Sequence, residues 1–173
     1  MKNLALILTL LLLVSCNNDD ENNNITSETQ IDLVTGINVR QDEFSTPIQL
    51  GNPNVFTNNQ FITFPNPATE ALSLLSPQGI TDVWIVPANA DKIYQETNFS
   101  SILNSDLYAE TLIQQNTELG FSDLNSTNLI LNLEDLSSGY YKVFVKINGS
   151  IFWENIYIAG NNFEIDDLIN YWN

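Results

Sequence analysis

The sequence contains no histidine and only one cysteine, Cys16. The absence of histidine excludes catalytic triads built on imidazole and zinc sites with imidazole ligands. A single cysteine cannot form an intrachain disulfide, and it excludes metal sites made of several cysteines. Because the commonest catalytic and metal-binding side chains are missing, we expect neither a metal nor another cofactor.

Basic residues are also scarce. Five Lys and Arg residues stand against 21 Asp and Glu residues, which gives a formal net charge of -16 at pH 7. Such an acidic surface repels phosphate backbones and anionic headgroups, so we expect no nucleic-acid partner and no electrostatic docking to membranes. Hydrophobic residues still make up 43% of the 173 residues, which is enough for one folded domain with its own core.

The N-terminal segment has the pattern of an export signal. Lys2 precedes an apolar run over residues 4–14, interrupted only by Thr9 and too short to span a bilayer. The run ends in Leu13-Val14-Ser15-Cys16, which resembles the lipobox of bacterial lipoproteins. This resemblance implies removal of residues 1–15, lipidation of Cys16 with acyl chains such as palmitate, and anchoring in a membrane. Two or more chains on one residue hold a protein there stably.

A polar spacer follows, since residues 17–24 are all Asn, Asp or Glu. A segment with nothing to bury is expected to be a disordered tether. Its acidic cluster either resembles the signal that sends some lipoproteins to the outer face of the outer membrane or is simply a solvated linker. We predict a signal peptide over 1–15, the tether over 16–30 and one domain over 31–173. We expect a lipid-anchored outer-membrane location, at the periplasmic or the cell-surface face.

The rest of the chain predicts an all-β fold. Apolar residues alternate or form short runs bounded by Asn, Ser, Gly and Pro, which favours about seven to nine short strands. The clearest element is a hairpin with strands over 140–147 and 150–158 around Asn148-Gly149. Asn-Gly accepts the positive φ angles of a type I′ turn, so the register follows, with Val145 opposite Phe152 and Phe144 opposite Trp153.

Other elements are less sharply marked. We predict strands over 60–64, 71–75, 82–86, 108–113 and 129–133, with prolines at strand edges, where a missing N–H does least harm. Residues 99–107 favour a short helix or an irregular crossover. Residues 163–172 carry apolar residues at helical spacing, which predicts a short C-terminal helix or turn.

Two segments resemble the C-terminal sorting domain of the type IX secretion system. Phe64-Pro65-Asn66-Pro67-Ala68, with the alternating residues 71–75, resembles its opening strand. Leu133-Glu134-Asp135-Leu136-Ser137-Ser138-Gly139-Tyr140-Tyr141, with Val143-Phe144-Val145, resembles its closing hairpin. The resemblance covers residues 64–159 and implies a small antiparallel β-sandwich, which we expect for this domain.

One face of the predicted hairpin is a candidate binding surface. It carries the aromatic residues Tyr140, Phe144, Trp153 and Tyr157, with Lys142 and Lys146 among them. Such a face could stack on sugar rings or hold a partner peptide. Alternatively, residues 31–61 or the terminal tail cover it, because large exposed apolar patches are rare on monomers.

No constellation of catalytic residues is evident. Serines and threonines are common, but none lies in a nucleophile motif with a base. Glu164, Asp166 and Asp167 form an acidic cluster without the alternating ligands and glycine of a calcium loop, which indicates a solvated surface. We therefore predict a non-enzyme with no metal site.

The sequence supports three hypotheses of function. The leading one is a non-enzymatic, membrane-anchored surface lipoprotein whose domain binds another protein or a glycan. The alternative is an accessory or scaffold component of the type IX secretion or gliding machinery. A third is an enzyme that uses only carboxylates.

Overall fold

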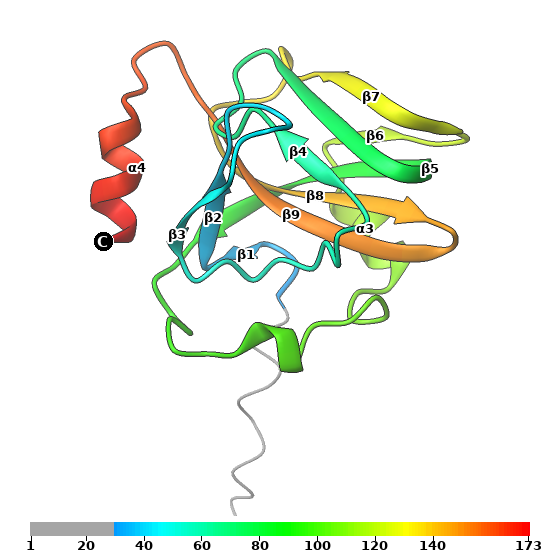
Figure 1. The fold of residues 1–173 in the computed structure, drawn as a ribbon, viewed down its shortest axis with the longest axis horizontal. Coiled ribbons are helices and arrows are strands. Elements are labelled where there is room, and N and C mark those ends of the chain that lie inside the picture. Colours follow the sequence, from blue (N-terminus) through cyan, green and yellow to red (C-terminus); the bar gives the residue numbers. More distant parts are fainter. Residues whose placement is uncertain (1–29) are drawn as a thin grey trace, which may run out of the picture.

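A computed structural model describes residues 30–173 of the protein (Figure 1). The predicted signal peptide, Cys16 and residues 16–29 of the predicted tether lie outside the described residues, so these remain predictions. Strands make up 45% of the described residues and helices 12%, and a short helix lies at the C-terminal end, which confirms a mostly β fold. The sheet is mixed and has seven strands.

The 20-residue strand β5 (Ala71–Ala90) organises the sheet. Its first half pairs with β4 (Ile62–Phe64) and β7 (Ser126–Asn132). Its second half pairs with β6 (Leu119–Phe121) and β8 (Gly139–Ile147), and β8 pairs in turn with β9 (Ser150–Ile158). The short strand β1 (Leu33–Val34) joins the end of β5 in parallel.

A two-stranded ribbon lies beside this sheet (Figure 1). It consists of β2 (Gly36–Val39) and β3 (Ile48–Gly51), paired in antiparallel register. β2 also contacts β9, so the ribbon packs against the last strand of the main sheet.

The prediction of two separate strands over 71–75 and 82–86 is wrong in one respect, because β5 runs through both. Its register shifts between Leu75 and Ile80, where Pro77 lies, and again before Asp82. Such irregularities bend a strand without ending it. The proline that predicted a strand edge therefore lies at a bend inside one strand.

Pro87 also lies inside β5, opposite Tyr141 of β8. On the other edge of β5, the carbonyl of Ile85 accepts a bond from Glu118 and the N–H of Asn89 donates to Asp32. Residues two apart on a strand point their backbone groups to the same edge. The missing N–H of Pro87 therefore falls in the gap between β6 and β1, where no ladder bond is lost.

The predicted hairpin is confirmed in its turn and its register. Asn148 and Gly149 have φ angles of 51° and 81°, as a type I′ turn requires. Val145 lies opposite Phe152 and Phe144 lies opposite Trp153. The hairpin thus presents one face to each side of the sheet.

The face of the hairpin that carries Val145 and Phe152 belongs to the main hydrophobic core, to which both halves of β5 contribute. Leu72 and Leu74 of the first half and Val83 and Ile85 of the second half are fully buried in one hydrophobic cluster. The hairpin, β7 and the residue that follows β7 add Leu131, Leu133, Tyr141, Val143, Val145, Phe152 and Ile156.

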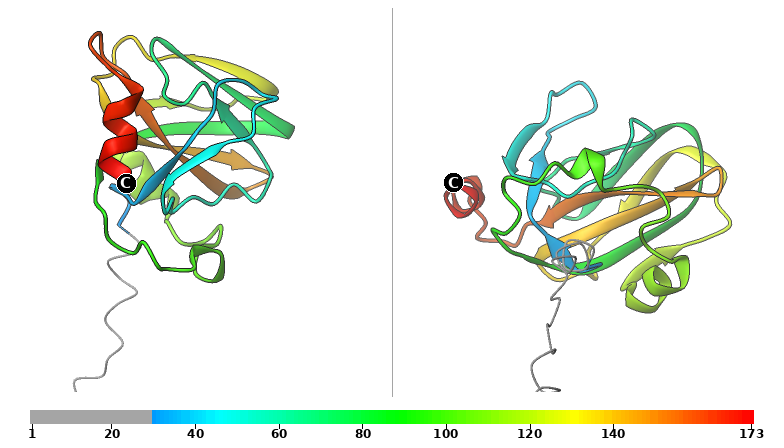
Figure 2. Two further views of the ribbon diagram at one scale, coloured as in Figure 1. Left: turned by 60° about the vertical axis from the view of Figure 1, so that its left-hand side comes forward. Right: turned by 90° about the horizontal axis from the view of Figure 1, so that it is seen from below.

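The opposite face, which carries Phe144 and Trp153, is covered by the middle of the chain (Figure 2). A 3-10 helix, η1 (Phe99–Ser101), and the helix α3 (Glu110–Asn116) belong to this cover. The prediction of a strand over 108–113 is wrong. Both edges of β5 are already paired there, so the segment crosses the face and satisfies its backbone bonds within a helix.

The chain ends in the predicted helix, α4 (Ile165–Trp172), which lies beside the ribbon (Figure 1). Its buried residues Leu168 and Trp172 pack against Ile37 and Leu50 of β2 and β3 in a third hydrophobic cluster. Burial of this face explains why the helical spacing of the tail leads to a stable helix.

Candidate functional site

The β2–β3 ribbon separates two surfaces of opposite character. Asn38 pairs with Gln49, and the next pair along is Val39 with Ile48. Since neighbouring side chains of a strand point to opposite faces, the amides and the aliphatic residues lie on different sides of the ribbon. Asn38 and Gln49 line a polar cleft, whereas Val39 and Ile48 line an apolar groove.

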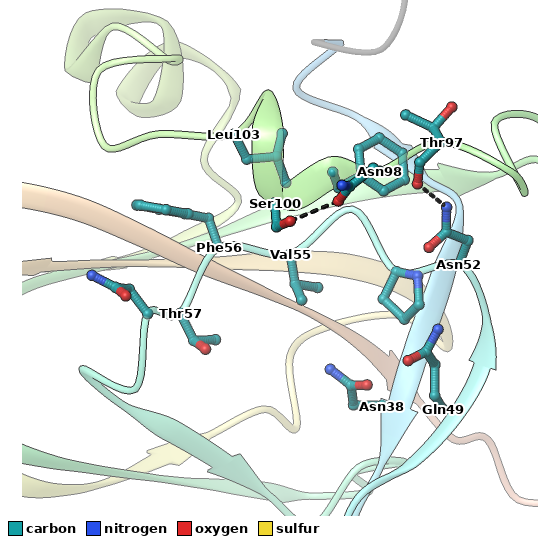
Figure 3. Close-up of a pocket in the computed structure, with 13 residues that line it drawn as sticks. Asn38, Gln49, Asn52, Val55, Phe56, Thr57, Thr97, Asn98, Ser100 and Leu103 are labelled. Carbon is teal, nitrogen blue, oxygen red and sulfur yellow. Dashed lines mark hydrogen bonds between the residues drawn. The ribbon is translucent and has the colours of Figure 1, made fainter.

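The polar cleft, which we call the amide cleft, has a volume of about 500 Å³. Figure 3 shows Asn38 and Gln49 on one side of it and Thr97, Asn98 and Ser100 on the other. None of its lining side chains is charged, although the protein is strongly acidic. The complete lining is Asn38, Gln49, Asn52, Pro53, Val55, Phe56, Thr57, Asn58, Thr97, Asn98, Phe99, Ser100 and Leu103.

Asn52 holds the two walls of the amide cleft together. Its side-chain N–H groups donate to the carbonyls of Tyr94 and Thr97, at 2.8 and 2.9 Å. On the far wall, the Ser100 hydroxyl donates to the side-chain carbonyl of Asn98 at 2.6 Å (Figure 3). Segments more than 40 residues apart in the chain are thereby fixed as one site.

Two side chains of the cleft contact alternate residues of β9, Phe152 and Glu154. The ring of Phe56 stacks on that of Phe152, with centroids 5.6 Å apart. The side-chain N–H of Asn38 donates to Oε1 of Glu154 at 3.0 Å. Burial raises the pKa of the Glu154 carboxyl to about 7, and its bond from Asn38 and the nearby charge of Arg40 oppose this shift.

Several polar groups of the cleft are free to bind a ligand. Within residues 30–173, the side chains of Thr57 and Asn58 make no hydrogen bond, and Gln49 bonds only to the carbonyl of Gly51. Asn58 and Asn59 adopt positive φ angles of 45° and 55°, which asparagine tolerates better than most residues. The turn therefore presents amide and hydroxyl groups at the mouth of the cleft.

Of the four aromatic residues predicted as a binding face, two are fully buried and two are partly exposed. Phe144 and Trp153 are 0% exposed, so they do not form a surface platform. Tyr108 packs on both rings with centroids 5.5 and 5.0 Å away, and Phe56 lies 5.3 Å from Trp153. The indole N–H of Trp153 donates to the carbonyl of Asn54 at 2.9 Å. The N-terminal segment and the middle of the chain together form this cover.

Tyr140 and Tyr157 remain half-buried beside α4. Their rings contact each other at 4.9 Å, and Tyr157 also packs against Phe163 at 5.2 Å. With Tyr171 they line a second cleft of about 470 Å³. Burial raises the pKa of Tyr140 to about 12, so its phenol is neutral at physiological pH.

The two lysines of the hairpin have different environments. Lys142 is fully buried, and its Nζ donates to the hydroxyl of Tyr108 at 3.2 Å. Burial lowers the pKa of Lys142 to about 7, against the opposing effect of Asp32. Lys146 forms an ion pair with Glu110 of α3 at 2.7 Å. Neither lysine reaches the amide cleft.

The acidic residues do not converge. Within the part of the chain that the structure describes, no three His, Cys, Asp or Glu residues are grouped so that they could hold a metal ion. Glu164, Asp166 and Asp167 are exposed at the start of α4. Among residues 30–173, no helix is both long and apolar enough to cross a membrane.

The sequence prediction missed the amide cleft. Its residues come from 38–58 and 97–103, which the hydrophobic pattern marked only as a possible cover or crossover. The available signal was compositional: Gly51-Asn52-Pro53-Asn54 and Asn58-Asn59 concentrate asparagine at turns. No family model matches the sequence, and no curated protein matches it.

Proposed function

We propose that the protein is a non-enzymatic, lipid-anchored surface protein of the outer membrane whose domain binds a neutral glycan in the amide cleft. The observation that carries this proposal is the lining of the cleft, where eight uncharged polar side chains surround a volume of about 500 Å³. Its size is within the range of small-ligand sites, about 300–1,000 Å³.

The chemistry of the lining suits sugar hydroxyls. A hydroxyl both donates and accepts hydrogen bonds, and a side-chain amide offers both functions at fixed positions. Phe56 at the wall adds an apolar ring for the C–H face of a sugar. The absence of charge in the lining favours a neutral ligand over an anionic or cationic one.

The resemblance to the type IX sorting domain supports a second proposal. The first resembling motif is bonded to β9, the strand that pairs with the second motif in β8: the side-chain N–H of Asn66 donates to the carbonyl of Asn155, and Asn66 Oδ1 accepts a bond from the N–H of Tyr157. We propose that the two halves of β5 belong to the two layers of an antiparallel sandwich related to that family. An accessory or scaffold role in type IX secretion or gliding is the alternative function.

The glycan proposal is tested by a glycan array followed by calorimetric titration of the retained neutral oligosaccharides. We expect Gln49→Ala and Ser100→Ala to weaken binding by about two- to tenfold each, the effect of one lost hydrogen bond. Gln115→Ala, an exposed amide on α3 outside the cleft, serves as the matched control. Retention of no glycan, or equal losses in the cleft and control variants, would refute the proposal.

The alternative is tested by affinity purification from solubilised outer membrane. Recovery of secretion or gliding subunits with the wild-type chain would favour the scaffold role. If the cleft variants recover these subunits as well as the wild type does, the partner binds elsewhere on the domain.

A further inference from the structure

The apolar groove lies on the aliphatic side of the β2–β3 ribbon. It continues the face that α4 covers: Ile37 and Leu50 are buried under the helix, whereas the next pair, Val39 and Ile48, extends beyond it. The groove has a volume of about 570 Å³, and most of its lining surface is apolar. Ile48 is 64% exposed, so a large aliphatic side chain lies open to solvent here.

One positive charge lines this groove. Arg40, the only arginine of the chain, is half-buried, and its backbone is fixed by reciprocal hydrogen bonds with Asn66 at 2.8 and 2.7 Å. Within residues 30–173 its guanidinium forms no ion pair at direct contact distance and no side-chain hydrogen bond, although its charge acts on the buried Glu154 carboxyl. A guanidinium whose N–H groups have no bonded partner, at an apolar surface, is suited to a carboxylate, which it can bind with two parallel hydrogen bonds.

The loop that follows Arg40 is fixed by hydrogen bonds and contributes polar residues to the rim of the groove. Oδ1 of Asp42 accepts bonds from the N–H groups of Phe44 and Ser45 and from the Ser45 hydroxyl, at 3.0, 2.8 and 2.7 Å. Ser45 lines the groove, and Phe44 beside it is 88% exposed.

We propose that this groove binds a long-chain aliphatic carboxylate, with the carboxylate on Arg40 and the chain against Val39, Ile48 and Ile165. The ligand's apolar chain suits the mostly apolar lining, and its single negative charge suits Arg40, the one charged residue of that lining. Asp42 and Glu43 lie between the lining residues Gln41 and Ser45, and Asp166 follows Ile165, so an extended anionic membrane surface would face these charges, whereas a single carboxylate on Arg40 need not. The site is separate from the amide cleft.

The test is calorimetric titration of dodecanoate, below its critical micelle concentration, into the full chain carrying Cys16→Ser, so that no acyl chain of the protein competes. We expect saturable binding of one equivalent. Arg40→Gln should weaken binding of dodecanoate at least tenfold, the effect of losing a charge-assisted bond. Dodecanol, which has the same chain without the charge, should bind the wild type and Arg40→Gln equally.

Two further variants identify the site. Ile48→Asp places a carboxylate in the groove at an exposed position and should abolish dodecanoate binding, while circular dichroism verifies the fold. Lys92→Gln removes an exposed cation outside the groove and should leave binding unchanged. Absence of saturable binding, an unchanged affinity in Arg40→Gln, or an equal loss in Lys92→Gln would overturn the proposal.

Discussion

Asn66 is a polar residue with a structural role. It is 1% exposed, and its side chain joins three segments: its N–H groups donate to the carbonyls of Asn38 and Asn155 at 2.7 and 3.0 Å, and its carbonyl accepts from Tyr157. An alanine cannot supply any of these bonds. Each buried group left without a partner destabilises the fold by about 1–3 kcal/mol.

We therefore predict that Asn66→Ala lowers the free energy of unfolding by about 3 kcal/mol or more, since several buried groups lose their partners together. Urea denaturation followed by circular dichroism measures this. Asn132→Ala, an exposed asparagine bonded only to Glu134, is the control and should change stability by less than about 0.5 kcal/mol. A similar small effect of both variants would show that Asn66 does not hold the motif to β9.

At the scale of elements, the parts that were predicted from sequence are those determined locally. The Asn148-Gly149 turn sets the register of β8 and β9 through its own backbone angles, and α4 follows from its apolar spacing. The middle of the chain could not be predicted in this way. Whether residues 108–113 become a strand or a helix depends on whether β5 has a free edge, and that depends on β6 and β8.

The amide cleft could not be predicted from the sequence for the same reason. Its two walls come from segments that no local pattern connects, and Asn52 joins them only once the sheet has formed. The aromatic face was visible in the sequence, but its cover was only half predicted. Residues of the N-terminal segment do contribute, whereas Phe99, Tyr108 and Ile113 of the middle segment were not expected there.

The docking of α4 gives a prediction for this element. Leu168 is 3% exposed against the ribbon, so Leu168→Asp places a charge in the third hydrophobic cluster and should detach the helix. We expect faster proteolysis between residues 159 and 165 and stronger binding of an apolar dye, with the main sheet intact. Asn170→Asp adds the same charge on the exposed side of α4 and should change neither measurement.

At the scale of the whole molecule, two buried ionisable groups set an unusual pH dependence. The ordinary pKa of Glu154 is 4.5 and that of Lys142 is 10.5, and burial brings both to about 7. Between pH 4.5 and 7, the folded chain keeps a proton on Glu154 that the unfolded chain has released, so this contribution to stability falls as pH rises. Between pH 7 and 10.5, the unfolded chain holds the extra proton on Lys142, so its contribution rises.

We predict that Glu154→Gln removes the falling part of the profile and Lys142→Met removes the rising part. The measurement is the difference in unfolding free energy between each variant and the wild type, from pH 5 to pH 10, in which the effects of the many other carboxylates largely cancel. Profiles parallel to that of the wild type over the whole range would contradict the prediction. They would mean that neither group changes its proton affinity on folding.

The proposed membrane location depends on Cys16, the last residue of the segment Leu13-Val14-Ser15-Cys16 that resembles a lipobox. We predict that labelled palmitate is incorporated into the wild-type protein and that Cys16→Ser abolishes both this label and recovery in the membrane fraction. Ser15→Ala, which keeps a small residue before the cysteine, is the matched control. Retention of the serine variant in the same fraction would contradict the lipid anchor.

The continuity of β5 has a consequence for how the protein comes apart. One uninterrupted strand forms backbone hydrogen bonds with β4 and β7 at one end and with β6 and β8 at the other. Unfolding of either end of β5 therefore removes hydrogen-bond partners from the strands that pair with it. Leu74 and Val83 also share one core. Slow opening should therefore expose both ends to deuterium exchange together, as a single cooperative unit.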